Sequence, residues 1–274
     1  MTCTFSPSGN LAAVGGLDNI CSIFDVSSVF KSSTFLASLT SKRNKLTRAK
    51  CELIGHEGYL SCCKFMDENT IITTSGDSTA IYWDIEKQSM ISSFSRHTGD
   101  ILSVCVDPPN HLCITASADA TAKVWDYRAP TKCILDFSGF HQSDINWFLY
   151  NTLYHTFFFF IEFLLLLHSV QLFPNKRSFV TGSDDMNCKL FDLRAFQQMA
   201  NYQSKDSICS VDVSISGYYL FVTSGRDFVI VWDTITAEEA YQLRHPHLTN
   251  RSQLSPNGHA VATGCCNFVL YIWS

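Results

Sequence analysis

Short apolar runs followed by polar turn residues recur along this chain, as expected of β-strands rather than long helices. One such run, Ala80-Ile81-Tyr82-Trp83, ends in an aromatic residue that is followed by Asp84. The same ending returns at Phe24-Asp25, Trp125-Asp126, Phe191-Asp192 and Trp232-Asp233, and Trp273 ends the last run. The pattern predicts an all-β protein built from six repeated units.

The spacing of these aromatic residues refines the prediction. Successive aromatics lie 59, 42, 66, 41 and 41 residues apart. An aromatic-Asp ending that returns after roughly 40–45 residues is the signature of WD40 β-propeller blades. The chain therefore resembles a WD40 β-propeller with six recognisable units, in one domain over residues 1–274. The two long intervals indicate insertions.

Polar residues also recur inside the units. An Asp precedes the aromatic by six residues in four units, and Asp suits a tight turn between two strands: Asp18, Asp77, Asp119 and Asp185. A His begins three units: His56, His97 and His141. We expect the His, the turn Asp and the Trp of a blade to be joined through a Ser or Thr such as Ser75. Each polar group satisfied in this way avoids a cost of about 1–3 kcal/mol.

These residues are therefore expected to be structural rather than catalytic. The full predicted set of blade residues is Asp18, Phe24, His56, Asp77, Trp83, His97, Asp119, Trp125, His141, Asp185, Phe191, Asp227, Trp232 and Trp273. Asp227 precedes its aromatic by five residues instead of six, which predicts the loss of one strand residue there. Asn267 takes the turn position of the last unit, and Asn can still support a tight turn.

Composition argues for a binding module. The net charge of −5 over 274 residues does not indicate the excess of basic residues that is typical of nucleic-acid-binding proteins. The twelve Cys show no zinc-ligand spacing and are expected to be reduced and mostly buried. Phosphate-loop, nucleophile-elbow and zinc-protease motifs do not occur in the sequence. Asp184 and Asp185 are adjacent on a predicted strand, so they point to opposite faces and make a poor acid–base pair. We expect no enzyme activity, no cofactor and no metal.

Several strings go beyond the repeat pattern and closely resemble the β subunit of heterotrimeric G proteins. They cover residues 1–10, 15–22, 58–63, 143–146, 181–185 and 190–194. The resemblance implies a seven-bladed propeller, so the six recognisable units are six of an expected seven. It also implies that the propeller pairs with a γ subunit, binds GDP-bound Gα through one face and then engages effectors. It places the protein in the cytoplasm, at the cytoplasmic face of the plasma membrane through Gγ and Gα. Carried over, the Gα and effector surface comprises Met1, Leu17, Asn19, Tyr59, Asp100, Leu102, Asp144, Asn146 and Asp184.

The chain also departs from that family. Family members begin with a helix that pairs with γ and with a first blade, both before the segment that matches Met1. The resemblance therefore predicts an open propeller whose last unit stops after its third strand. Cys266 stands where the family has a Trp of the Gα surface, which predicts weaker binding there. An alternative function is a general WD40 scaffold that binds neither γ nor Gα.

Residues 147–168 are the clearest departure. Removing these 22 residues shortens the third interval from 66 to 44 and restores the repeat. A transmembrane helix is one interpretation, because about 20 apolar residues can span a bilayer, although polar residues interrupt this stretch. An exposed hydrophobic loop is the second. The third is a translated intron end, which the runs of Phe and Leu without Lys or Arg favour. The extra residues between Ser27 and Lys50 indicate either a solvated inter-blade loop or a second gene-model error.

Overall fold

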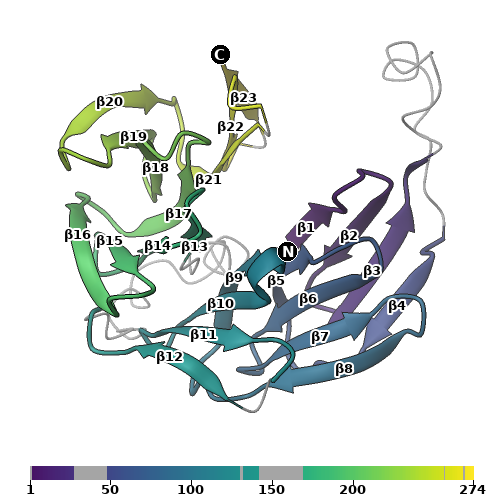
Figure 1. The fold of residues 1–274 in the computed structure, drawn as a ribbon. Helices are drawn as coiled ribbons and strands as arrows, with labels where there is room; N and C mark the ends of the chain where they lie inside the picture. The colour runs from purple at the N-terminus through teal and green to yellow at the C-terminus, as the bar shows by residue number, and fades with distance from the viewer. Residues whose placement is uncertain (1, 28–47, 130–131, 142–168, 256, 268) are drawn as a thin grey trace, which may run out of the picture. The chain divides into compact units, whose positions relative to one another are not determined.

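The computed structural model describes residues 2–27, 48–129, 132–141, 169–255, 257–267 and 269–274. Strands β1 to β23 form six antiparallel sheets, and the 3-10 turn η1 (Pro108–Asn110) interrupts them once (Figure 1). The six sheets confirm the predicted all-β class and its six repeated units. Within the described ranges, no helix is long and apolar enough to cross a membrane.

The chain divides into two compact units, and each is described by itself. Unit 1 comprises Met1–Cys113 and Trp125–Cys133, and unit 2 comprises Ile114–Val124 and Ile134–Ser274. Residues 28–47 and 142–168 lie outside the described residues. The predicted inter-blade loop and the predicted insertion fall on these ranges. The same holds for three of the predicted surface residues, Met1, Asp144 and Asn146.

The first three sheets contain twelve strands. The first sheet has the order β1-β2-β3-β4: β1 (Thr2–Phe5), β2 (Leu11–Gly15), β3 (Ile20–Asp25) and β4 (Cys51–Ile54). The second has the order β5-β6-β7-β8: β5 (Leu60–Phe65), β6 (Thr70–Ser75), β7 (Ala80–Asp84) and β8 (Ser89–Phe94). The third has the order β12-β11-β10-β9: β9 (Ile101–Asp107), β10 (Leu112–Ser117), β11 (Ala122–Asp126) and β12 (Cys133–Phe137).

The other three sheets belong to unit 2. The fourth runs β13-β14-β15-β16: β13 (Ser169–Leu172), β14 (Ser178–Gly182), β15 (Asn187–Asp192) and β16 (Gln197–Gln203). The fifth runs β17-β18-β19-β20: β17 (Ile208–Val213), β18 (Tyr219–Ser224), β19 (Phe228–Asp233) and β20 (Glu239–Arg244). The sixth has three strands, β21 (Thr249–Leu254), β22 (Val261–Cys265) and β23 (Leu270–Trp273).

Strand pairing is in the same register from sheet to sheet. The aromatic residue faces the residue twelve positions before it in five sheets: Ala12↔Phe24, Ile71↔Trp83, Phe179↔Phe191, Leu220↔Trp232 and Val261↔Trp273. The predicted loss of a strand residue near Asp227 is therefore wrong. The β18–β19 hairpin has its full length, and Arg226 occupies the position six residues before Trp232.

The turns between the second and third strands share a backbone conformation. The residue five positions before the aromatic has a left-handed φ of 61° to 65° in four of them: Asn19, Ser78, Ala120 and Met186. The preceding Asp accepts the backbone N–H two residues further on, from Ile20, Thr79, Thr121 or Asn187, at 2.9–3.4 Å. The side chain of the Asp thus closes the turn, as its position in the sequence predicts.

The sheets are held by buried apolar side chains. In unit 1 one core cluster includes Leu53, Leu60, Ile71 and Trp83. In unit 2 the ring centroid of Phe137 lies 5.0 Å from the ring centroid of Phe179 and 5.1 Å from that of Phe191. Such aromatic pairs contribute about 0.5–1.5 kcal/mol beyond the area they bury. The core therefore fixes the position of the turns at which the candidate site lies.

Candidate protein-interaction site

A buried hydrogen-bond network joins the strands of the β5–β8 blade. His56 contacts Asp77 through Nδ1 at 2.9 Å and the Thr73 hydroxyl through Nε2 at 2.8 Å. The indole N–H of Trp83 donates to the same Thr73 oxygen at 2.8 Å. An ionised Asp77 carboxylate can only accept, so the Nδ1–H of His56 donates to it. In the neutral imidazole Nε2 is then the acceptor, and it accepts from the Thr73 O–H, whose oxygen accepts the N–H of Trp83.

Burial determines the charge state of this network. Burial lowers the pKa of His56 against the opposing effect of the Asp77 carboxylate. Burial also acts to raise the pKa of Asp77, but hydrogen bonds from Thr79, His56 and the Glu57 backbone outweigh it and hold that pKa below its usual value. The network therefore contains a neutral imidazole and an ionised carboxylate, and its polar groups are used to hold the blade together.

The predicted network is confirmed in the β5–β8 blade, but Ser75 is not its hub. Ser75 instead accepts a hydrogen bond from the backbone N–H of Asp77 at 3.1 Å. The hub is a Thr ten residues before the aromatic, which the sequence interpretation missed although it recurs in four units: Thr73, Thr115, Thr181 and Thr263. In the β13–β16 blade, His141 bonds Asp185 at 2.8 Å and Thr181 at 2.7 Å, while Phe191 cannot donate.

The sixth sheet has a partial network, centred on a His that the sequence interpretation also missed. His245 contacts Thr263 through Nε2 at 2.7 Å, and Trp273 donates to Thr263 at 3.1 Å. Asn267 stands at the Asp position, and His245 Nδ1 is buried without a hydrogen-bond partner among the described residues. The turn itself persists, because Asn267 accepts the N–H of Val269 at 3.2 Å.

The β17–β20 blade lacks the network altogether. By strand register, Ser204 takes the His position, Val222 the Thr position and Arg226 the Asp position. The indole N–H of Trp232 is buried without a partner within the described part of the chain. An unsatisfied buried donor of this kind costs about 1–3 kcal/mol.

Backbone hydrogen bonds connect the Asp-bearing turns to the starts of neighbouring sheets, and we call the result the turn edge. In unit 1 the N–H of Leu60 donates to Gly16 at 2.9 Å, and Gly76 donates to Tyr59 at 3.0 Å. In unit 2 four such bonds form a series of 2.8–3.1 Å: Ile208 to Ser183, Gly225 to Ser207, Thr249 to Arg226 and Cys266 to Leu248. The turns of each unit therefore share one edge.

Four of the predicted surface residues, Leu17, Asn19, Tyr59 and Asp100, lie at the turn edge of unit 1, and two of them, Tyr59 and Asp100, are in contact. The Leu17 side chain is 65% exposed, and the side-chain amide of Asn19 donates to the Glu57 carbonyl at 3.1 Å. The Tyr59 hydroxyl donates to Asp100 at 2.8 Å. Burial and then this carboxylate raise the pKa of Tyr59, so the phenol stays protonated. Leu102 differs from the others, because it is only 4% exposed.

Close packing holds the Tyr59 ring in place. A Cβ atom built on Gly76 would lie 2.3 Å from Tyr59 Cε1, so the ring needs a glycine at that position. In unit 2, Asp184 lies in the β14–β15 turn, half-buried. Burial, and then the charge of Asp185, raise the pKa of Asp184 to about 6.

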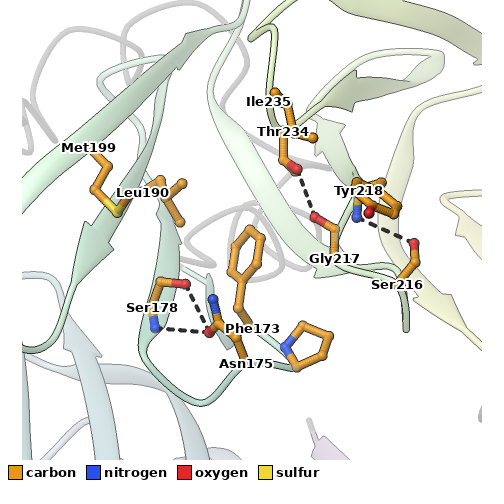
Figure 2. Close-up of a pocket in the computed structure, with 11 residues that line it drawn as sticks. Phe173, Asn175, Ser178, Leu190, Met199, Ser216, Gly217, Tyr218, Thr234 and Ile235 are labelled. Atoms are coloured by element: carbon orange, nitrogen blue, oxygen red, sulfur yellow. Dashed lines mark hydrogen bonds between the residues drawn. The ribbon is translucent and has the colours of Figure 1, made fainter.

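Unit 2 also has a pocket of about 270 Å³ at the opposite end of its strands (Figure 2). Phe173, Leu190, Met199, Tyr218 and Ile235 contribute its apolar walls. Its polar groups are satisfied internally, as Figure 2 shows: Ser178 donates to Asn175 at 3.1 Å and Thr234 to the Gly217 carbonyl at 2.7 Å. The β13–β14 and β17–β18 turns place this pocket away from the turn edge.

The described residues contain no group of three or more His, Cys, Asp and Glu arranged to hold a metal ion. The His–Asp pairs at 2.8–2.9 Å are directed into the blades, towards Thr73 and Thr181. What the arrangement offers chemically is therefore an edge of fixed turns that carries exposed apolar, aromatic and charged side chains.

Comparison with known proteins agrees with this arrangement. The WD40 family model, described as "WD domain, G-beta repeat", matches residues 1–25, 48–84, 88–126 and 167–192. The guanine nucleotide-binding protein subunit β of Arabidopsis thaliana is 33% identical over the whole chain and 69% of the relative's length. The corresponding subunits of Solanum tuberosum and Oryza sativa subsp. japonica are 34% and 32% identical over the same shares. These relatives favour the predicted β-subunit function over a general WD40 scaffold, and the chain belongs to the family of G-protein β subunits.

Proposed function

We propose that this protein is a non-catalytic signal transducer that binds GDP-bound Gα through its turn edge, pairs with a γ subunit and engages effectors once Gα is released. Through these partners it works at the cytoplasmic face of the plasma membrane. The observation that carries the proposal is the fixed Tyr59–Asp100 pair with the exposed Leu17 at the turn edge of unit 1, in a chain of this family.

The chemistry of this group suits protein binding. Leu17 supplies an exposed apolar anchor, and Tyr59 an amphipathic one, and residues of these kinds dominate the energetics of many interfaces. The Tyr59 ring is already fixed by Gly76 and Asp100. A partner that binds it therefore loses little side-chain entropy, which favours affinity. Glu57 and Asp100 provide the polar rim that commonly surrounds such anchors.

The sector near Asp184 is expected to contribute less. Cys266, which is half-buried in the turn that follows β22, offers a small thiol where the family has a large aromatic side chain. Truncation of an aromatic anchor often costs about 2 kcal/mol or more. We therefore propose weaker Gα and effector engagement in this sector than in intact family members.

A binding experiment with the full chain and a γ subunit tests the proposal. The purified pair should bind GDP-loaded Gα and release it when the nucleotide is a non-hydrolysable GTP analogue. Tyr59→Ala should weaken this binding by about tenfold or more, because it removes an anchor. Met90→Ala is the matched control, since Met90 is 56% exposed on β8 of the same blade but away from the turn edge.

Thermal melting shows whether each variant is folded, and Tyr59→Phe separates the ring from its bond to Asp100. Failure of the wild-type pair to bind GDP-loaded Gα would contradict the proposed function. Equal binding by folded Tyr59→Ala and wild type would remove the turn edge of unit 1 from the interface.

A further inference from the structure

The β17–β20 blade exposes a cation where other blades hold a carboxylate. Arg226 occupies the position that Asp77 and Asp185 take in their own turns. The Arg226 side chain is 60% exposed, compared with 13% for Asp77 and 8% for Asp185. Asp77 and Asp185 are directed into their blades by His56 and His141, whereas Arg226 is directed to solvent.

Nothing inside the blade engages Arg226 in the way that the network engages the Asp. Ser204 and Val222 replace the His and Thr, so that position has lost its inward partners. Arg226 Nε forms an ion pair with Asp206. A guanidinium has five N–H donors, so this pairing leaves enough to bind a second carboxylate through two parallel bonds.

Two further cations lie beside Arg226. Lys205 is exposed and immediately precedes Asp206 in the chain. Arg244, also exposed, faces Phe228 in the β19–β20 register, next to the bond between the His245 N–H and the Asp227 carbonyl. The corresponding edge of unit 1 carries Glu57, Asp77 and Asp100. Asp206 and Asp227 also lie at the edge of the β17–β20 blade, so its three cations stand beside two carboxylates, whereas the three named charges of the unit 1 edge are all acidic. An acidic group of a partner is therefore better accommodated beside Arg226 than at the edge of unit 1.

Arg226 is part of the turn edge of unit 2. Its carbonyl accepts the Thr249 N–H at 2.8 Å and the Thr249 hydroxyl at 2.8 Å. The N–H of the adjacent Gly225 donates to the Ser207 carbonyl. Ile208, which follows Ser207 in the chain, donates its N–H to the carbonyl of Ser183, the neighbour of Asp184. A partner that contacts Asp184 would thus meet Arg226 within the same run of turns.

We propose that Lys205, Arg226 and Arg244 form a binding surface for an acidic segment of Gα, in which Arg226 selects partners that place a carboxylate there. The inference rests on the proposed function, because it assumes that the turn edge binds Gα. It goes further in naming the residue that sets partner preference at this blade and the charge that the partner must carry.

Charge reversal tests the inference. Arg226→Asp, in the full chain with γ, should weaken binding to GDP-loaded Gα about tenfold at about 0.05 M salt, and the loss should shrink at about 0.3 M salt, where screening is stronger. The affinity of Arg226→Lys for GDP-loaded Gα should lie between those of wild type and Arg226→Asp, because Lys keeps the charge but cannot form the bidentate pair with a carboxylate. Arg194→Asp is the matched control: it makes the same charge change at an exposed Arg in the β15–β16 turn, at the other end of the strands.

The outcomes separate this inference from the proposed function. If folded Arg226→Asp binds Gα within about twofold of wild type while Tyr59→Ala still weakens binding, the inference is wrong and the proposed function stands. An equal loss in Arg194→Asp would also overturn it, because the effect would then be one of net charge. If the wild-type pair does not bind Gα at all, both the inference and the proposed function are wrong.

Discussion

The β5–β8 and β17–β20 blades have the same strand pairing but opposite internal chemistry. Trp83 and Trp232 face residues twelve positions earlier in both. Around Trp83 the His56–Thr73–Asp77 network is complete, whereas around Trp232 none of its members remains. The comparison shows that strand register and apolar burial are enough to form a blade. The polar network adds stability and draws the turn residue inward.

The sixth sheet is an intermediate case. It keeps His245 and Thr263 but has Asn267 where the complete network has Asp. The turn survives, because an amide oxygen can accept the N–H of Val269 as a carboxylate would. His245 Nδ1 nevertheless remains unpaired. A single Asp-to-Asn difference thus separates the formation of the turn from the completion of the network.

Removal of the hub from the complete network should have the largest effect. Thr73→Val leaves the Trp83 indole N–H and His56 Nε2 buried and unpaired, at about 1–3 kcal/mol for each group. We expect the free energy of unfolding to fall by about 3 kcal/mol, measured by urea denaturation followed by tryptophan fluorescence.

Val222→Thr is the converse control in the other blade. It supplies an acceptor for Trp232 Nε1 and should raise the free energy of unfolding by up to about 1 kcal/mol. The contrast between the blades would be broken if Thr73→Val cost less than about 0.5 kcal/mol, because a lost network should cost more than an ordinary surface change.

Completion of the partial network should have an intermediate effect. Asn267→Asp provides a charged acceptor for the Nδ1–H of His245, and we expect about 1–2 kcal/mol of added stability at pH 7. As for Asp77, the pKa of the new carboxyl should lie below its unfolded value of about 3.9. The gain should therefore be present above that value and disappear as the pH falls through the depressed pKa.

The exposed Asn201→Asp variant makes the same charge change outside the network. It controls for net charge in the same urea experiment. If Asn267→Asp and Asn201→Asp gave equal stabilities, His245 would not be using the new carboxylate.

The pH dependence of stability should show the smallest effect. Burial lowers the pKa values of His56 and His245, so the unfolded chain binds more protons near pH 6. Their contribution is fully present above the unfolded value of about 6.5 and is lost as the pH falls through the depressed folded values. Asp184 opposes this trend, because its raised pKa of about 6 favours the folded state once the carboxyl is protonated.

The two contributions can be separated with Asp184→Asn. In that variant, the free energy of unfolding should fall more steeply between pH 7 and 5 than in wild type, as measured by urea denaturation. A stability that rises on acidification in the Asp184→Asn protein would contradict neutral, buried histidines.

The sequence predicts the repeat well because aromatic residues and turn carboxylates are fixed by backbone geometry. It could not choose between Thr73 and Ser75, because residues two apart on a strand point to the same face. Asp227 suggested a missing strand residue because it was taken as the turn Asp. The strand register, set by Trp232, shows instead that Arg226 holds the turn position and that Asp227 lies one residue after it. Leu102 was assigned to the surface, whereas β9 is largely buried on both of its faces, which apolar character alone could not show.

The turn that carries Asp18, Asp77, Asp119 or Asp185 keeps one shape while its next residue is Asn19, Ser78, Ala120 or Met186, all left-handed. The carboxylate and the paired strands impose that shape, and each non-glycine residue carries a strain of about 1–2 kcal/mol. The backbone of the turn is therefore the same in these four blades, whereas the side chain that follows the Asp differs from blade to blade. Residues on this edge can change, and with them the choice of partner, while the blades behind them stay as they are.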